Sequence, residues 1–201
     1  VGAGLAGCCT AWALARRGWR VTLIERHAGE AREASGNAQG ILYCKLSPHH
    51  PPLSRFIQSS YAYSLHLLRS ILPEDNVGWS ACGVLQLSGD AKEAARLQAL
   101  AEQGYPPEFL HGVTEDQASQ IAGVQVNEGG LHFPGGGWVN PPALCAALLR
   151  HPAIELKTCC EAISLDYNGE QWHAVDTQGV TLESAPVAII CSAGDSKRFA
   201  Q

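Results

Sequence analysis

Three glycines near the start of the chain have the spacing with which dinucleotide-binding proteins hold a pyrophosphate. They stand in Gly2-Ala3-Gly4-Leu5-Ala6-Gly7, ahead of an apolar helical stretch over 8–15. In this pattern Gly2 permits a tight turn, Gly4 lets the backbone approach the phosphates, and Gly7 lets the helix pack closely on a sheet. The free N–H groups at the helix N-terminus favour an anion. The spacing therefore predicts dinucleotide binding.

An acidic residue follows this turn at the distance, about twenty residues, expected for a ribose contact. The apolar run 21–24 ends at Glu25, whose carboxylate can accept hydrogen bonds from the ribose hydroxyls. A glycine-rich turn alone is weak evidence, but here the helix, the second strand and the acid all follow. We expect the strand that would precede Gly2 to be cut off at Val1, and the chain to be a fragment.

Two further segments have the composition of ligand-facing backbone. Residues 34–40 are small or carry amides, which suits a backbone that donates N–H groups to a ligand; the alternative is an exposed turn. The glycine-dense stretch 129–142 disfavours a plain strand or helix and favours packing against a flat ligand or another segment, with a flexible loop as the alternative. Lys45 is either exposed or directed at the cofactor, and the sequence favours exposure.

The elements that must position these residues change character along the chain. Apolar periodicity and capping residues predict helices over 53–72, 91–102 (capped by Asp90) and 141–150, and a short helix that opens with a capping box at Thr114 and Gln117. Strands are predicted over 79–87 with a weak point at Gly83, 154–157, 162–167, 171–176, 180–183 and 187–191, with a hairpin at Asn168-Gly169. The middle of the chain does not repeat the opening βαβ pattern, so we expect an inserted second domain.

Composition excludes several classes of function. The formal net charge is −5, which argues against this segment alone binding nucleic acid strongly. The eight cysteines form no CxxC motif and the eight histidines no HExxH motif, so we expect no metal and no disulfide framework. Apolar runs are too short to span a bilayer, and nothing resembles a signal peptide. We expect a cytoplasmic protein without a membrane partner.

Together these motifs resemble the D-amino-acid-oxidase-like FAD oxidoreductases, and within them the oxidoreductase domain of bifunctional enzymes that modify the tRNA wobble uridine. The resemblance covers essentially the whole chain and is carried by 34–40, Leu42-Tyr43, 45–47, 82–87, Phe133-Pro134, 136–139, Pro141 and 196–199. The chain departs from the family at Cys44, where proline is usual, at Gly135, where a polar residue is common, and at 191–194, which replace a small-Asn-Gly ending.

The resemblance implies an α/β fold: a Rossmann-like FAD-binding domain with an antiparallel three-stranded excursion and an inserted α+β substrate domain, truncated at both ends. We place the first part of the FAD-binding domain at 1–75, the inserted substrate-domain part at 76–136, and the second, incomplete part of the FAD-binding domain at 137–201.

The resemblance also implies FAD as the cofactor and assigns residues to it. The cofactor-binding residues are Gly2, Ala3, Gly4, Leu5, Ala6, Gly7, Glu25, Arg26, Ser35, Gly36, Asn37, Gln39, Gly40, Ala193 and Gly194. Gly136, Gly137 and Trp138 are the substrate-facing candidates, and Lys45 is a candidate neighbour of the flavin. No catalytic residue is identified, and the arginine expected to hold a substrate carboxylate is not placed in this chain.

The implied activity is oxidative removal of the carboxymethyl group from 5-carboxymethylaminomethyl-(2-thio)uridine in tRNA, which gives the aminomethyl base. The implied partners are tRNA, bound through parts outside this chain, and a covalently linked methyltransferase domain. One alternative is an FAD-dependent oxidase of glycine, sarcosine or a D-amino acid, which the acidic balance favours slightly. Another, of a different class, is an inactive nucleotide-binding fragment.

Overall fold

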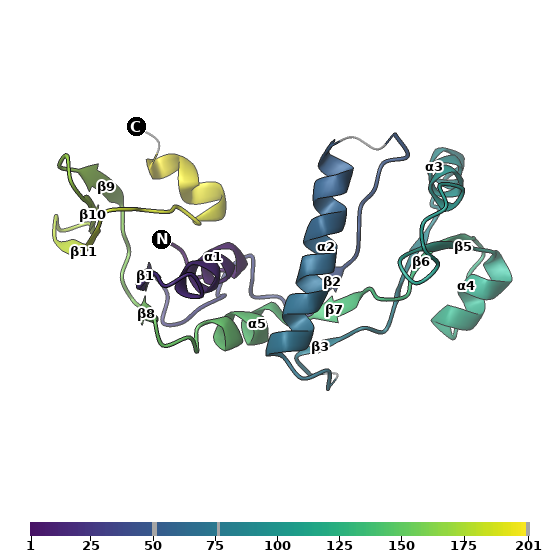
Figure 1. Cartoon of the computed structure of the whole chain (residues 1–201), viewed down its shortest axis with the longest axis horizontal. Helices are drawn as coiled ribbons and strands as arrows, with labels where there is room; N and C mark the ends of the chain where they lie inside the picture. Colours follow the sequence, from purple (N-terminus) through teal and green to yellow (C-terminus); the bar gives the residue numbers. More distant parts are fainter. Residues whose placement is uncertain (50–51, 76, 200–201) are drawn as a thin grey trace. The chain divides into compact units, whose positions relative to one another are not determined.

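A parallel strand pair flanked by helices forms the first part of the fold (Figure 1). The computed structural model describes residues 1–49, 52–75 and 77–199. The chain divides into unit 1, Val1–Ala38 with Asn140–Gln201, and unit 2, Gln39–Val139. In unit 1, β1 (Val21–Ile24) and β8 (Ile154–Lys157) are parallel, and α1 (Leu5–Ala15) packs on both strands and on α5 (Pro141–Leu148). The predicted helix and strand after the glycine-rich turn are confirmed.

The glycine-rich turn is packed too closely for side chains at two positions. Gly2 has a φ of 98°, and a Cβ on it would lie 2.7 Å from the carbonyl oxygen of Cys191. A Cβ on Gly7 would lie 1.8 Å from the carbonyl oxygen of Gly2. Since no other residue lacks a Cβ, α1 can approach the turn this closely only with glycine at these positions.

The apolar run 187–191 forms no regular strand, so that prediction is wrong. Its backbone is nevertheless paired: the Val1 amino group donates to Ile189 O at 2.7 Å, and Cys191 N donates to Val1 O at 2.8 Å. Gly2 N in turn donates to Ile24 O at 2.9 Å, which joins the same segment to β1. These hydrogen bonds hold the run beside Val1 without forming a regular strand. The run continues into the 3-10 helix η1 (Ala193–Phe199).

An antiparallel sheet of three strands, in the order β11-β10-β9, follows β8. It is the three-stranded excursion that was predicted. Its strands are β9 (Ser164–Tyr167), β10 (Trp172–Val175) and β11 (Thr181–Ala185). At the predicted hairpin, Asn168 Oδ1 accepts from the N–H groups of Glu170 and Gln171, and Gly169 has a φ of 102°. Buried Ala162, Leu165 and Ala174 pack with Ile24 of β1 in one cluster.

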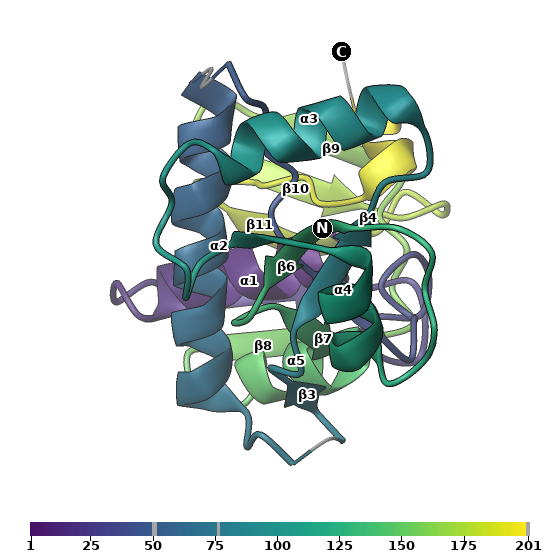
Figure 2. The same ribbon diagram turned by 90° about the vertical axis from the view of Figure 1, so that its right-hand side faces the viewer.

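The described residues of unit 2 form two three-stranded antiparallel sheets and three helices (Figure 2). One sheet has the order β2 (Gly40–Leu42), β7 (Gly137–Val139), β3 (Trp79–Ser80); the other has β4 (Val84–Leu87), β6 (Gly130–Phe133), β5 (His111–Val113). The helices are α2 (Pro52–Ile71), α3 (Ala91–Ala101) and α4 (Glu115–Ala122). α3 runs crosswise to α2, as Figures 1 and 2 show. None of the described helices has the length and apolar character needed to cross a membrane.

An apolar cluster packs between helices and strands of unit 2. It joins Tyr61 of α2, Leu97 and Leu100 of α3, and Leu131 and Phe133 of β6, all at most 5% exposed. The caps were read correctly from the sequence: Asp90 accepts from Glu93 N, and Thr114 and Gln117 form the reciprocal capping box. Each cap satisfies helix N–H groups that have no intrahelical partner.

The glycine-dense stretch differs from its prediction, because it supplies β6 and β7. A Cβ on Gly130 would lie 2.0 Å from Gln86 O, and one on Gly137 would lie 1.9 Å from Ser80 O. The glycines therefore allow close contact between neighbouring backbones while the strands remain paired. Of the two kinds of packing expected for this stretch, against a ligand or against another chain segment, the second describes the contacts of Gly130 and Gly137.

The observed division of the chain differs from the expected boundary after residue 75. Residues 39–75 belong to unit 2, because β2 pairs with β7 and α2 contributes Tyr61 to the unit 2 core. The second boundary, expected after residue 136, follows Val139. The role of unit 2 as a substrate domain stays a prediction.

Candidate nucleotide-binding site

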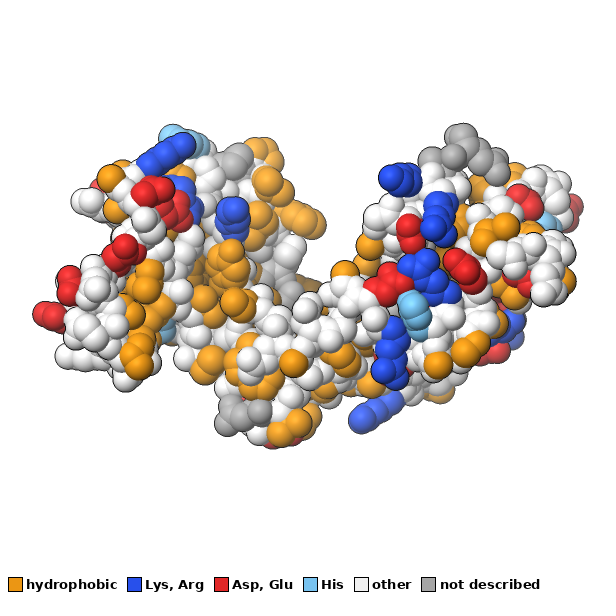
Figure 3. Space-filling view, turned by 180° about the vertical axis from the view of Figure 1, so that it is seen from behind, with side chains coloured by type: hydrophobic (Ala, Val, Ile, Leu, Met, Phe, Trp, Pro, Cys, Tyr) orange, Lys and Arg blue, Asp and Glu red, His pale blue; other side chains and the backbone are white. Residues whose placement is uncertain are grey.

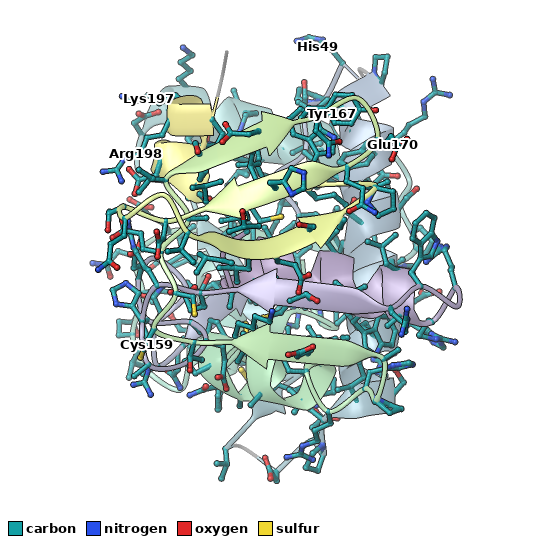
Figure 4. The ribbon with its side chains drawn as sticks, turned by 90° about the vertical axis from the view of Figure 1, so that its left-hand side faces the viewer. His49, Cys159, Tyr167, Glu170, Lys197 and Arg198 are labelled. Atoms are coloured by element: carbon teal, nitrogen blue, oxygen red, sulfur yellow. The ribbon has the colours of Figure 1, made fainter. Side chains whose placement is uncertain are left out.

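A cavity of about 370 Å³ opens in unit 1 where the glycine-rich turn meets the carboxyl end of β1. This volume falls in the range of small-molecule sites, roughly 300–1,000 Å³. β1 and β8 both point to the edge of unit 1 at which Cys159, Lys197 and Arg198 are labelled (Figure 4). Ligands of parallel α/β sheets bind at this carboxyl edge. The cavity therefore lies beside the glycine-rich turn, and its role as a dinucleotide site stays a prediction.

Ser35 joins the second ligand-facing segment to the first turn of α1. Its Oγ accepts from Leu5 N at 3.0 Å, and a Cβ on Gly4 would lie 3.0 Å from the same oxygen. Both residues line the cavity, as does Ser35. The N-terminal N–H groups of a helix carry partial positive charge. The hydroxyl and these N–H groups therefore form one polar wall suited to a phosphate.

Glu25 is buried, with 7% of its surface exposed, and holds the turn in place. Its Oε2 accepts from Ala3 N at 2.8 Å, and its Oε1 accepts from His27 N at 2.9 Å. A carboxylate oxygen can accept a further hydrogen bond, so these bonds leave room for the predicted ribose contact. The structure adds a second role that the sequence did not suggest, namely fixing the backbone of the glycine-rich turn.

Charged side chains form a connected rim around the cavity. Arg26 bonds to Glu33 and, at 3.0 Å, to Asp195, and it lies 3.7 Å from Glu161. Arg198 lies 3.7 Å from Glu161 and 3.6 Å from Asp195. Acidic and basic side chains alternate on this part of the surface of unit 1 (Figure 3). The rim therefore ties the loops after β1 and β8 to η1.

The contacts within the rim also set the protonation states of Glu33 and Arg26. The hydrogen bond from His27 to Glu33, at 2.7 Å, and that from Arg26 hold the pKa of the Glu33 carboxyl below its usual range. The same contact with Glu33, followed by that with Asp195, raises the pKa of Arg26. Glu33 is therefore an ionised acceptor at neutral pH, and it is a structural partner of Arg26 and His27.

Most residues assigned to the cofactor line this cavity. They are Gly2, Ala3, Gly4, Leu5, Ala6, Glu25, Arg26, Ser35 and Ala193. Gly7 lies behind the turn in contact with Gly2, and the other assigned residues of unit 1, Gly36, Asn37 and Gly194, are not among the lining residues. Gln39 and Gly40 belong to unit 2. The binding roles of all these residues stay predictions.

The substrate-facing candidates all lie in unit 2. Gly136 and Gly137 are buried, Trp138 is half-buried opposite Ile41 in the β2-β7 pair, and Lys45 is exposed. A Cβ on Gly136 would meet Leu42 O at 3.0 Å and Phe133 O at 3.1 Å. Packing within the chain explains this glycine without a ligand, so the predicted substrate wall remains untested.

Several cavity residues were missed by the sequence reasoning. His27, Arg32, Glu161, Asp195 and Arg198 all line the cavity. His27 and Glu161 come shortly after the carboxyl ends of β1 and β8, which is the edge where such sheets bind ligands. That rule could have found these two. Arg32, Asp195 and Arg198 depend on how irregular loops fold, for which the sequence pattern carries no signal.

The chemistry of the site fits the ADP half of FAD. A helix N-terminus, closely packed glycines and a buried carboxylate at a strand end are the donor set for the ADP half of a dinucleotide. Within the described ranges, no group of three or more His, Cys, Asp or Glu side chains could hold a metal ion.

Comparison with known proteins identifies the family of the chain. The sequence model of the DAO family, FAD dependent oxidoreductases, matches residues 1–201. The chain is 52% identical over 201 residues to the tRNA 5-methylaminomethyl-2-thiouridine biosynthesis bifunctional protein MnmC of Chromobacterium violaceum, covering 99% of this chain and 30% of that protein. It is 48% identical to the protein of the same name from Stutzerimonas stutzeri, covering 100% and 30%. The chain therefore spans about 30% of the length of these curated relatives.

Solved structures share the fold. Glycine oxidase from Geobacillus kaustophilus superposes with a TM-score of 0.79 at 22% identity, over 98% of this chain and 55% of that one. Fructosamine oxidase from Aspergillus fumigatus (Amadoriase II) gives 0.77 at 19% identity, over 98% and 49%. At such identities the likeness concerns the fold alone. Because the family match spans every residue, the chain belongs to the FAD-dependent oxidoreductases of the DAO family.

Proposed function

We propose that this chain forms part of an FAD-dependent amine oxidoreductase that acts on the tRNA wobble position. The substrate is 5-carboxymethylaminomethyl-(2-thio)uridine, and the products are the aminomethyl base and glyoxylate. One observation carries the proposal: relatives about half identical over the whole chain are named as tRNA 5-methylaminomethyl-2-thiouridine biosynthesis bifunctional proteins. By the same likeness, tRNA and a linked methyltransferase domain are the proposed partners, and the cytoplasm is the proposed location.

In this proposal the residues of unit 1 bind and orient the cofactor. The Glu25 carboxylate accepts hydrogen bonds from the ribose hydroxyls. The Ser35 hydroxyl and the N-terminal N–H groups of α1 donate hydrogen bonds to the pyrophosphate. When bound, FAD would supply the two-electron oxidation of the carbon between the amine nitrogen and the carboxylate, and hydrolysis of the oxidised product would release glyoxylate. Gly136, Gly137 and Trp138 of unit 2 form the proposed substrate wall, with Lys45 as a candidate neighbour of the flavin.

The test uses the protein with all of its encoded flanking sequence and tRNA that carries 5-carboxymethylaminomethyl-2-thiouridine. We expect glyoxylate and the aminomethyl nucleoside to appear in equal amounts. Mass spectrometry measures the nucleoside in digested tRNA and glyoxylate in the reaction solution. tRNA without the modification serves as the control. Turnover of free glycine at a rate equal to that of modified tRNA would instead identify an amino-acid oxidase.

The amino-acid oxidase is the second candidate because the formal net charge of −5 disfavours a polyanion on this part of the protein. Glycine, sarcosine and D-amino acids are its candidate substrates. The two proposals share the FAD site and differ in the substrate alone, so the same assay with each amine separates them. Absence of both activities, together with loss of flavin, would favour the inactive nucleotide-binding fragment.

A further inference from the structure

The cationic side chains that line the nucleotide cavity differ in their partners. Arg26 and Arg198 face carboxylates of Glu33, Glu161 and Asp195. Arg32 also lines the cavity and is exposed, but it has no carboxylate within 4.0 Å among the described residues. Its positive charge is therefore the least compensated of the three.

The backbone on either side of Arg32 is fixed to the glycine-rich turn. Ala31 N donates to Ala3 O at 2.9 Å, and Ser35 Oγ accepts from Leu5 N at 3.0 Å. Ala31 is 4% exposed and has a φ of 54°, an uncommon conformation for a residue with a Cβ. Strained backbone persists where the surroundings hold it, and it is concentrated at functional sites. Arg32 thus projects from a segment anchored at both ends beside the N-terminus of α1.

The guanidinium of Arg32 is folded against its own turn. A Cβ on Gly29 would lie 3.3 Å from its Nη2 and 3.4 Å from its Nε. Glycine at this position therefore leaves room for the guanidinium to rest on the backbone. Guanidinium groups bind phosphate through paired N–H donors, which a lysine cannot reproduce.

We propose that Arg32 is a phosphate-binding residue of this cavity and contacts the pyrophosphate of FAD. It adds a full positive charge to the N–H groups of α1 and the hydroxyl of Ser35. This inference rests on the membership of the FAD-dependent family and not on the identity of the amine substrate. A failure of the tRNA assay therefore leaves it unaffected.

The experiment measures cofactor affinity in apoprotein prepared from the full-length enzyme. Arg32→Gln should weaken FAD binding roughly tenfold, as loss of one charge-assisted contact predicts, and should flatten the dependence of the affinity on salt between about 50 and 500 mM. Arg32→Lys should retain most of the salt dependence. Riboflavin, which has no phosphate, should bind the wild type and Arg32→Gln equally.

Arg150→Gln provides the matched control, because Arg150 is exposed in the same unit and does not line the cavity. It should leave FAD affinity and salt dependence unchanged. Wild-type FAD affinity in Arg32→Gln would overturn the proposal. An equal loss of FAD and riboflavin binding would also overturn it, because that result assigns Arg32 to the shape of the site and not to the phosphate.

Discussion

At the scale of single residues, the cavity of unit 1 combines backbone N–H groups of the glycine-rich turn with charged side chains. The glycine-rich turn could be predicted from the sequence because its glycines have a characteristic spacing. The double hydrogen bond from Ala3 N and His27 N to Glu25 was not readable, because it joins backbone donors that every residue carries. Glu25 could be predicted as a ligand contact, but its structural role could not.

Glu25→Gln should weaken FAD binding by about tenfold or more, because hydrogen bonds to a charged acceptor contribute roughly 1.5–3 kcal/mol. The amide would also turn an NH₂ group toward one of the two backbone donors. Flavin fluorescence titration of the apoprotein measures the effect. Glu155→Gln, an exposed change on the neighbouring strand β8, is the control. Equal affinity in both variants would remove Glu25 from the cofactor site.

Gly7→Ala should destabilise unit 1 by about 3 kcal/mol or more, because its Cβ would lie 1.8 Å from Gly2 O, where only backbone movement can relieve the clash. Urea unfolding followed by circular dichroism measures this. Gly89→Ala is the control, because a Cβ there would meet nothing within 4 Å. Similar midpoints for the two variants would contradict the close packing of α1 on the turn.

Helices and hairpins were the most predictable elements, because their signals are local. Asp90, Thr114 and Gln117 cap helices as read from the sequence, and Asn168-Gly169 forms the hairpin turn. The strands of the glycine-dense stretch were missed, because their pairing depends on Gln86 and Ser80, which are distant in sequence. Local propensity carries no information about such partners.

Thr114→Ala should cost about 1 kcal/mol, because it removes the side chain that accepts from Gln117 N and breaks the capping box. Denaturant unfolding of the whole chain measures the change. Ser59→Ala, an exposed change inside α2, should have little effect in the same experiment. A loss of the same size in Ser59→Ala would mean that the cap contributes nothing specific.

The ion pair between β8 and β11 makes the stability of unit 1 depend on pH. Lys157 Nζ lies 2.9 Å from Glu183 Oε2, and this contact lowers the pKa of the Glu183 carboxyl below the usual 4.5. The stabilisation is therefore complete above pH 4.5 and is lost as the pH falls through the lower pKa of the folded state. Wild type and Glu183→Gln should differ in urea midpoint near pH 7 and converge as the pH falls below the folded-state pKa of Glu183. A constant difference at every pH would refute this role.

At the scale of the whole molecule, the sequence predicted an insertion within a nucleotide-binding fold, and the compact unit 39–139 begins before the predicted insertion. The apolar periodicity of α2 predicts an amphipathic helix. It does not predict the core against which the apolar face packs. The paired ends of unit 2, Gly40 with Val139, show where the insertion begins and ends. Asn140 Nδ2 donates to Ala38 O at 3.1 Å, which closes the chain of unit 1 directly outside those ends.

Unit 2 has its own apolar core and paired ends, so residues 39–139 should fold as a separate protein. We expect cooperative thermal unfolding and dispersed amide resonances. Phe133→Ala in the same fragment should lower its stability by roughly 3–5 kcal/mol, because Phe133 is fully buried. A fragment with no cooperative transition would show that the core of unit 2 is insufficient alone.

The insertion also has a consequence for the order of folding. β1 and β8 pair in parallel although the whole of unit 2 separates them along the chain. Closing so long a loop costs conformational entropy before any strand contact compensates for it. If unit 2 forms first, its paired ends bring Ala38 and Asn140 together and shorten the loop that remains. Unit 1, which carries the proposed cofactor residues, should therefore be the last part to fold, and FAD should bind only after β1 and β8 have paired.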